Sequence, residues 1–217
     1  MKYKLVVFDM DGTVLNTLND LQDAVNFALS KFSFPPRSFD EIKSFVGNGI
    51  PKLIERSVPT DTDENIRKAV YDVFTPYYQK HCMDKTTSYD GITELLASLK
   101  KAEYKTAVVS NKDDYAVKEL VKVYFPGGFD FSLGRTDGVD KKPAPDMVNR
   151  AMEYFNVEKT EAVYVGDSDV DFMTAKNSGL EFIGVSWGFK GRNFLQNLGA
   201  ERIADDAKQL FEFIVNA

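Results

Sequence analysis

Short, continuously apolar runs recur along the chain, and such runs are typical of strands buried on both faces of a parallel sheet. Five of them occupy residues 5–8, 106–109, 129–133, 162–165 and 182–185. Helical patterns lie between the later runs, at residues 92–100, 114–124, 145–155 and 170–178. Strands that alternate with helices in this way predict right-handed crossovers. The expected fold is therefore an α/β fold with a doubly wound parallel sheet.

Residues 17–85 interrupt this alternation. They contain helical patterns at residues 18–32 and 64–79, but no convincing strand pattern. We therefore predict a helical domain of residues 17–85, inserted into a core domain of residues 1–16 and 86–217. Open α/β sheets bind ligands outside the carboxyl ends of their strands. We expect the insert to cover that edge as a cap.

Composition narrows the class of protein. The chain has 217 residues, of which 43% are hydrophobic and 28% are charged, as in ordinary globular proteins. Its net charge of −6 argues against a nucleic-acid partner. One cysteine, Cys82, cannot form a disulfide framework or a cysteine-rich zinc site. No apolar run approaches the ~20 residues that span a bilayer. We expect a soluble cytoplasmic protein, a monomer or homodimer, that acts on a small molecule.

Two carboxylates follow the first predicted strand, in the sequence DMDGT that begins at Asp9. Asp9 and Asp11 can both face one crevice there, one as a nucleophile and the other as a general acid and base. An ordinary Asp-Gly turn explains this segment equally well. A calcium loop does not, because its sixth and twelfth positions would be Val14 and Asp20 and not glycine and glutamate.

Polar residues follow other predicted strands as well. Ser110 and Asn111 come directly after one strand, and Lys142 precedes Pro143 and a helical pattern. A hydroxyl, an amide and an ammonium group are suited to bind phosphate oxygens. Taken singly, they are also explained as turn residues, helix caps or solvated cations.

Three acids cluster in the sequence GDSDVD, which follows the run at residues 162–165. A helix cap explains one of Asp167, Asp169 and Asp171, but not all three. With no cation beside them in the sequence, they would repel one another unless a metal ion neutralised them. Ligation by oxygen atoms alone suits Mg²⁺. Because all of these polar groups end parallel strands, we expect them to meet at one edge of the sheet.

These four motifs resemble those of the haloacid dehalogenase superfamily. The matching segments are DMDGT, the loop at Ser110, Lys142-Pro143 and GDSDVD. The position of the insert resembles the helical cap of subfamily I. The segments FVGNGIPKLIERSV, KKPAPD and SWGF resemble those of phosphoglycolate phosphatases. The resemblance covers nearly the whole chain and implies a magnesium-dependent phosphatase of small phosphomonoesters, with 2-phosphoglycolate as the leading substrate.

The resemblance also implies roles for the acids and the lysine. Asp9 would be the nucleophile that becomes an aspartyl-phosphate, and Asp11 would protonate the leaving alkoxide and then deprotonate water. Asp9, the backbone carbonyl of Asp11 and Asp167 would ligate Mg²⁺. Lys142 would neutralise the phosphoryl oxygens, and Asp171 would support Lys142 or a metal-bound water.

Further residues are implied in supporting roles. Ser110 would orient the phosphoryl group together with the backbone N–H groups of Gly12 and Asn111, and Thr13 would orient the first motif. Many relatives have an aspartate where this chain has Asn16, which retains hydrogen bonding but not the charge.

Specificity is expected from the insert. Asn48 and Gly49 form a turn at a predicted helix start and could contact the far end of the substrate. Arg56 could pair with a substrate carboxylate or remain a solvated charge. Relatives of similar sequence act on pyrophosphate, nucleotides or sugar phosphates, so these substrates remain alternatives.

Three other functions are compatible with parts of this pattern. A phosphomutase would use the same groups but return the phosphoryl group to a second sugar hydroxyl. A non-catalytic phosphate-binding protein would be expected to lack Asp9 or Asp167, and both are present. The GxSxG segment around Ser186 suggests a serine esterase, but the histidine of such an enzyme follows the serine. The only histidine, His81, precedes it.

Overall fold

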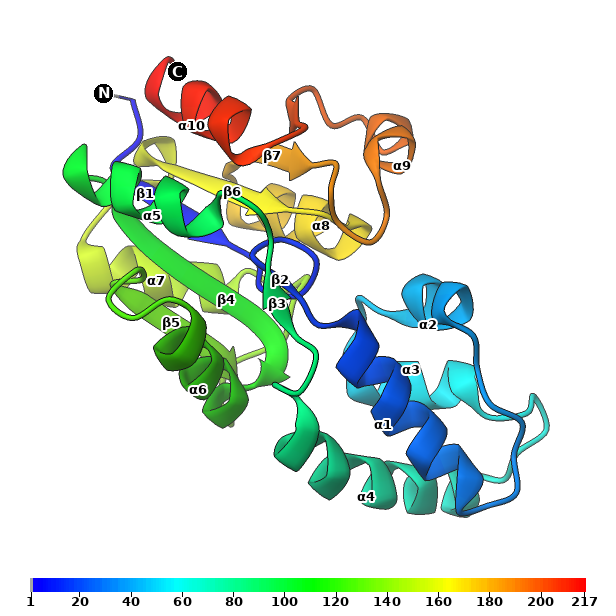
Figure 1. Cartoon of the computed structure of the whole chain (residues 1–217). Helices are drawn as coiled ribbons and strands as arrows, with labels where there is room; N and C mark the ends of the chain where they lie inside the picture. Colours follow the sequence, from blue (N-terminus) through cyan, green and yellow to red (C-terminus); the bar gives the residue numbers. More distant parts are fainter. Residues whose placement is uncertain (1) are drawn as a thin grey trace. The chain divides into compact units, whose positions relative to one another are not determined.

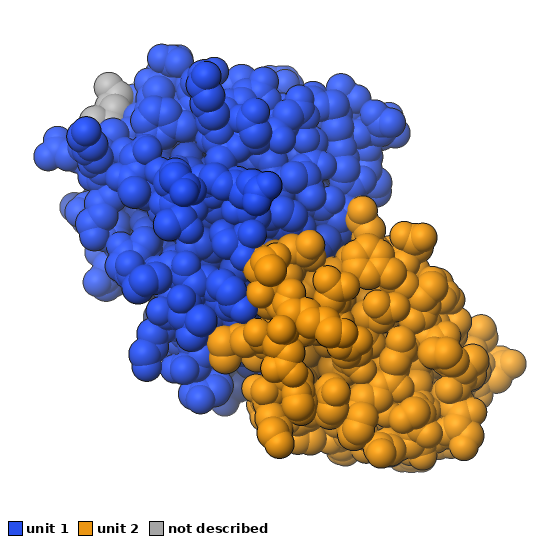
Figure 2. All heavy atoms as spheres, viewed as in Figure 1, with its two compact units in different colours: residues 1–15, 88–217 blue, residues 16–87 orange. Residues whose placement is uncertain are grey.

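The computed structural model describes residues 2–217, which form two compact units (Figure 2). Unit 1 contains the chain up to Leu15 together with Ser88–Ala217, and unit 2 is Asn16–Thr87. Among the described residues, no helix has both the length and the apolar character needed to cross a membrane.

A six-stranded parallel sheet forms the centre of unit 1 (Figure 1). Its strands are β1 (Leu5–Phe8), β4 (Lys105–Asp113), β5 (Phe131–Arg135), β6 (Ala162–Gly166), β7 (Glu181–Val185) and β8 (Ile203–Ala204). They are arranged in the order β5-β4-β1-β6-β7-β8, and each neighbouring pair is parallel. The predicted α/β class and doubly wound parallel sheet are therefore confirmed.

Helices cover both faces of this sheet. They are α5 (Ile92–Lys101), α6 (Asp114–Tyr124), α7 (Asp146–Phe155), α8 (Asp169–Ser178), α9 (Arg192–Asn197) and α10 (Ala207–Val215), with a 3₁₀ turn at Lys159–Glu161. Alternate residues of β1 enter separate apolar clusters. Val6 and Phe8 pack in one cluster with residues of α5, α6 and α10, whereas Leu5 and Val7 pack in another with residues of α7 and α8. Because β1 is buried on both faces, its carboxyl end is held rigidly in the middle of the sheet.

Three details of the sheet differ from the sequence prediction. The strand predicted at residues 129–133 lies two residues later, as β5 at Phe131–Arg135. The strand expected to end at residue 109 continues as β4 to Asp113, with a register shift against β5 between Val109 and Asp113. The polar side chains after Val109 therefore belong to an irregular strand end and not to a loop. The two-residue strand β8 was not predicted, because Ile203 and Ala204 form too short a run to give a strand signal.

Unit 2 is built from helices, as the insert pattern predicts. They are α1 (Leu18–Ser30), α2 (Phe39–Phe45), α3 (Ile50–Ser57) and α4 (Glu64–His81). Short strands β2 (Leu15–Asn16) and β3 (Thr87–Ser88) pair where the chain leaves unit 1 and returns to it. Within unit 2, the buried carboxylate of Asp20 accepts hydrogen bonds from the backbone N–H groups of Lys85 and Thr86 at 2.9 and 2.8 Å. These bonds hold the two ends of the insert together.

Candidate active site

The first motif lies directly after β1, at the carboxyl edge of the sheet. Asp9 is buried, with 7% of its surface exposed, and its backbone N–H donates to the carbonyl of Val165 in β6 at 2.9 Å. Parallel strands on both sides of β1 place the ends of β4 and β6 next to Asp9. Groups from distant parts of the chain therefore meet at this carboxylate.

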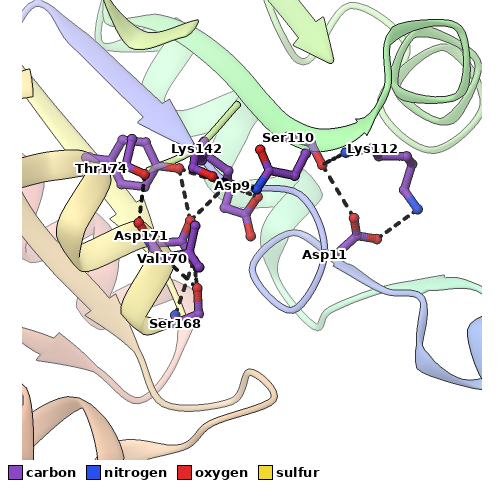
Figure 3. Close-up of polar contacts among 11 residues, drawn as sticks. Asp9, Asp11, Ser110, Lys112, Lys142, Ser168, Val170, Asp171 and Thr174 are labelled. Carbon is purple, nitrogen blue, oxygen red and sulfur yellow. Dashed lines mark hydrogen bonds and ion pairs between the residues drawn. The ribbon is translucent and has the colours of Figure 1, made fainter. Parts of the chain in front are cut away.

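Lys142 forms the centre of a buried polar network (Figure 3). Its ammonium group donates to Oδ1 of Asp9 at 2.5 Å, to Oδ1 of Asp171 at 2.8 Å and to the hydroxyl of Tyr164 at 3.0 Å. The Tyr164 hydroxyl in turn donates to Oδ1 of Asp171 at 3.0 Å. An ammonium group has three protons, so these three acceptors fix its position.

Asp171 is held from both sides. Its Oδ2 accepts hydrogen bonds from the backbone N–H and the hydroxyl of Ser168, which caps α8. Its Oδ1 accepts from Lys142 and Tyr164. Both carboxylate oxygens are thus engaged by protein groups, an arrangement suited to orienting Lys142.

Three acids approach one another closely enough to share a metal ion. Carboxylate oxygens of Asp9, Asp167 and Asp171 lie within 4.8 Å of one another, and all three residues are buried. Burial, followed by the charge of Asp171, raises the pKa of Asp9 to about 7. Burial and the charges of Asp171 and Asp9 likewise raise the pKa of Asp167 well above its ordinary value. Lys142 alone does not offset this repulsion, and oxygen donors in this arrangement fit a divalent cation such as Mg²⁺.

A second ion pair lies beside the first. Nζ of Lys112 is 3.2 Å from Oδ1 of Asp11, and Oγ of Ser110 donates to Oδ2 of Asp11 at 3.4 Å (Figure 3). Ser110 Oγ also accepts from the backbone N–H of Lys112 at 3.1 Å. Lys112 is buried, whereas about a fifth of the Asp11 side chain (20%) is exposed. The end of β4 thus holds a second, partly exposed carboxylate near the nucleophile candidate.

The predicted phosphate-binding residues lie in the same unit, but two of them make unexpected contacts. The N–H of Gly12 donates to the carbonyl of Leu15 at 2.9 Å, and its role toward a phosphoryl group stays a prediction. The amide of Asn111 donates to the backbone carbonyl of Lys142 at 3.0 Å. The Asn111 side chain therefore ties the end of β4 to the segment that carries Lys142.

The remaining candidate residues lie in both units. Thr13 is fully buried, and its carbonyl accepts from the indole N–H of Trp187 at 3.0 Å. Asn48, Gly49 and Arg56 all lie in unit 2. Gly49 is the N-cap of α3, and Arg56 donates to the carbonyl of Phe45 at 2.7 Å. The site described here consists of unit 1 residues only.

Sequence reasoning missed two members of the site. Tyr164 lies inside a continuously apolar strand, so nothing in the pattern marks its hydroxyl as functional. Lys112 belongs to the polar segment Ser110-Asn111-Lys112 that ends a predicted strand, but the sequence led to no role for it. Ser186 lies outside the network and donates to Asp205 at 2.6 Å, so the GxSxG segment does not form an esterase site with a histidine.

Comparisons with known proteins agree with this geometry. The family model of the haloacid dehalogenase-like hydrolases matches residues 6–185. The chain is 30% identical to the phosphoglycolate phosphatase of Psychrobacter arcticus over 225 residues, covering 100% of this chain and 98% of that protein. It is 29% identical to the phosphoglycolate phosphatase of Vibrio parahaemolyticus, covering 97% of this chain and 96% of that protein.

A solved structure is similar over its whole length. This protein, from Lactobacillus delbrueckii subsp. bulgaricus and provisionally named a phosphoglycolate phosphatase, is 38% identical, with a TM-score of 0.96 and 100% of each chain covered. The two curated relatives and this solved structure are all named phosphoglycolate phosphatases.

Proposed function

Because the chain belongs to the haloacid dehalogenase-like hydrolase family, we propose that it hydrolyses small phosphomonoesters, 2-phosphoglycolate above all, through an aspartyl-phosphate on Asp9. The chain is a phosphoric monoester hydrolase, as its relatives at about 30% identity are. One observation supports the mechanism most strongly. The Asp9 carboxylate accepts a hydrogen bond from the Lys142 ammonium at 2.5 Å and belongs, with Asp167 and Asp171, to a cluster of acids that fits a divalent cation.

In the first step, a carboxylate oxygen of Asp9 attacks phosphorus and the bond from phosphorus to the ester oxygen breaks. Lys142 holds Asp9 in place and neutralises charge on the phosphoryl oxygens. Asp11 gives its proton to the leaving alkoxide, which departs as an alcohol. Lys112 and Ser110 keep the Asp11 carboxylate in one orientation during this transfer.

In the second step, the ionised Asp11 takes a proton from water as the water oxygen attacks the phosphorus of the aspartyl-phosphate. The bond between phosphorus and the Asp9 oxygen breaks, so inorganic phosphate leaves and both carboxylates return to their starting states. Asp11 thus acts first as an acid and then as a base, and the steps balance without any other proton carrier in the chain.

We propose that Mg²⁺ is held by the carboxylates of Asp9 and Asp167 with the backbone carbonyl of Asp11. Bound there, the ion would neutralise charge on the phosphoryl group and on the acids around it. Asp171 is assigned to Lys142 and not to the metal, because both of its oxygens already accept hydrogen bonds. Unit 2 is proposed to act as a cap that selects the substrate, with Asn48, Gly49 and Arg56 as its candidate contacts.

The proposal is tested with a panel of phosphorylated metabolites at saturating Mg²⁺, with phosphate release as the readout. We expect the highest kcat/KM for 2-phosphoglycolate, no activity in EDTA, and lower values for pyrophosphate, nucleotides and hexose phosphates. A transient mass increase of one phosphoryl group on the protein, lost in the Asp9→Asn variant, identifies the intermediate. Hydrolysis that is indifferent to EDTA, or an Asp9→Asn variant with normal turnover, contradicts the mechanism. An isomerised hexose phosphate without phosphate release identifies a phosphomutase.

A further inference from the structure

Residues 187–189, which follow β7, contact the acidic site, although they supply no catalytic group. The backbone N–H of Phe189 donates to Oδ2 of Asp167 at 2.7 Å. This contact follows from the sheet order, because β6 and β7 are parallel neighbours and the segments after them lie side by side. One oxygen of a buried carboxylate is thereby fixed, and the other remains available for a ligand.

Gly188 brings the same segment into van der Waals contact with the acid. A Cβ atom on Gly188 would lie 2.3 Å from Cβ of Asp167 and 2.5 Å from the carbonyl oxygen of Gly12. A Cβ atom on Gly12 would lie 2.6 Å from Oδ2 of Asp167. Real Cβ atoms do not approach so closely, so only glycine fits on either side of Asp167. Two backbone segments therefore confine this carboxylate.

Trp187 connects the segment to the nucleophile loop. Its indole N–H donates to the carbonyl of Thr13 at 3.0 Å, across 174 positions of sequence. The ring packs against the apolar cluster of unit 1, and Tyr89 lies beside it at 6.4 Å between ring centroids. The loop that carries Asp9 and the carboxylate of Asp167 are thus attached to one segment.

We infer that residues 187–189 are positioning residues that set the separation of the Asp9 and Asp167 carboxylates, and with it the affinity for a divalent cation. This inference rests on the proposed metal-dependent function. The segment acts through Asp167 and Thr13 and touches no substrate. Its glycine and tryptophan are explained by this role, because a larger residue at 188 displaces the acid and the loss of the indole N–H releases the loop.

The test compares Gly188→Ala and Trp187→Phe with Ser186→Ala, a control one residue earlier whose hydroxyl donates to Asp205 and not to the acids of the site. Binding of Mn²⁺ to the metal-depleted full chain is measured by electron paramagnetic resonance, and unfolding is measured without metal. We expect Gly188→Ala to weaken Mn²⁺ binding on the order of 10- to 100-fold. Trp187→Phe keeps an aromatic side chain but removes the indole N–H, so we expect a loss of about fivefold, as for one hydrogen bond. Ser186→Ala should bind Mn²⁺ as the wild type does.

Unchanged Mn²⁺ affinity in folded Trp187→Phe and Gly188→Ala overturns the inference, even when their metal-free unfolding midpoints fall, because a purely structural role lowers stability alone. If Gly188→Ala does not fold, Trp187→Phe decides by itself. A wild-type protein that binds Mn²⁺ but hydrolyses no phosphomonoester overturns only the proposed function. A wild type without Mn²⁺ binding overturns both.

Discussion

Nζ of Lys142 lies 2.5 Å from Oδ1 of Asp9, although 133 positions separate the two residues in the chain. Burial by itself would lower the pKa of Lys142, but the charges of Asp171 and Asp9 raise it well above its ordinary value. Lys142 therefore remains a cation, and it holds together Asp9 and Asp171, which are buried as it is. The integrity of the site depends on this one side chain.

Replacing Lys142 with methionine should damage both stability and turnover. The substitution leaves two buried carboxylates without their cation, which typically costs about 3–5 kcal/mol. Turnover should fall on the order of 10³-fold, because a charge that stabilises the transition state is lost. Urea unfolding and phosphate release measure the two effects. Lys141→Met is the matched control, since Lys141 is the exposed neighbour. Equal unfolding free energies for the two variants contradict the prediction.

Tyr164→Phe removes one hydroxyl from the network and leaves the ring in place. The hydroxyl bonds both Lys142 and Asp171, so we expect a stability loss of about 1–2 kcal/mol. Turnover should fall less than in Lys142→Met, because the lysine charge remains. Urea unfolding measures the first effect, and kcat measures the second. Tyr154→Phe, at a tyrosine that is 65% exposed, should change neither quantity.

Asp9→Asn should abolish turnover while the chain still folds. An amide cannot form the aspartyl-phosphate, and loss of a nucleophile typically lowers kcat by at least about 10⁴-fold. Phosphate release and circular dichroism are the measurements. Asp169→Asn, in the same acid-rich sequence as Asp167 but outside the described contacts of the site, serves as a control. Residual activity within about tenfold of the wild type argues against Asp9 as the nucleophile.

Without metal, the protein should lose stability as the pH rises. Asp9 has its pKa raised from 3.8 to about 7 in the folded state, so between these values the folded protein holds a proton that the unfolded chain has released. Stability from this group is present below pH 3.8 and is lost as the pH rises through about 7. Asp167, whose pKa is also raised, contributes with the same sign.

Thermal unfolding in EDTA at pH 5, 6 and 8 measures this effect, and the midpoint should fall across the series. Added Mg²⁺ should restore stability most at pH 8, because it binds the deprotonated acids. Asp9→Asn should show a weaker pH dependence than the wild type. A midpoint that rises from pH 5 to pH 8 in the metal-free wild type contradicts the assignment.

Lys112→Met should slow phosphoenzyme formation by an amount that depends on the leaving group of the substrate. Lys112 holds Asp11, which must protonate an alkoxide but not a nitrophenolate, because the latter leaves as a stable anion. In single-turnover experiments, formation of the phosphoenzyme should therefore slow more for 2-phosphoglycolate than for p-nitrophenyl phosphate. Lys118→Met, at an exposed lysine paired with Asp114, should slow neither. An equal loss with both substrates indicates that Lys112 does not act through Asp11.

The sequence by itself determined the sheet and which strand ends carry polar groups. Continuous apolar runs can be read locally, and DMDGT, Ser110, Lys142 and GDSDVD follow them or flank them. Parallel pairing brings such ends to one edge, so the gathering of Asp9, Lys142 and Asp167 followed from general rules of the fold. The helical character of the insert was likewise visible, because its periodicity is a local property.

Only the tertiary structure decided how each polar group is used. Tyr164 is indistinguishable from its apolar neighbours until its hydroxyl meets Lys142, and Gly188 is an ordinary loop glycine until Asp167 lies against it. The sequence likewise does not show that the N–H of Gly12 donates to the carbonyl of Leu15. Such contacts depend on distances of a few tenths of an ångström between segments far apart in the chain. Spacing along a sequence fixes which strand ends meet, but not which atoms of those ends touch.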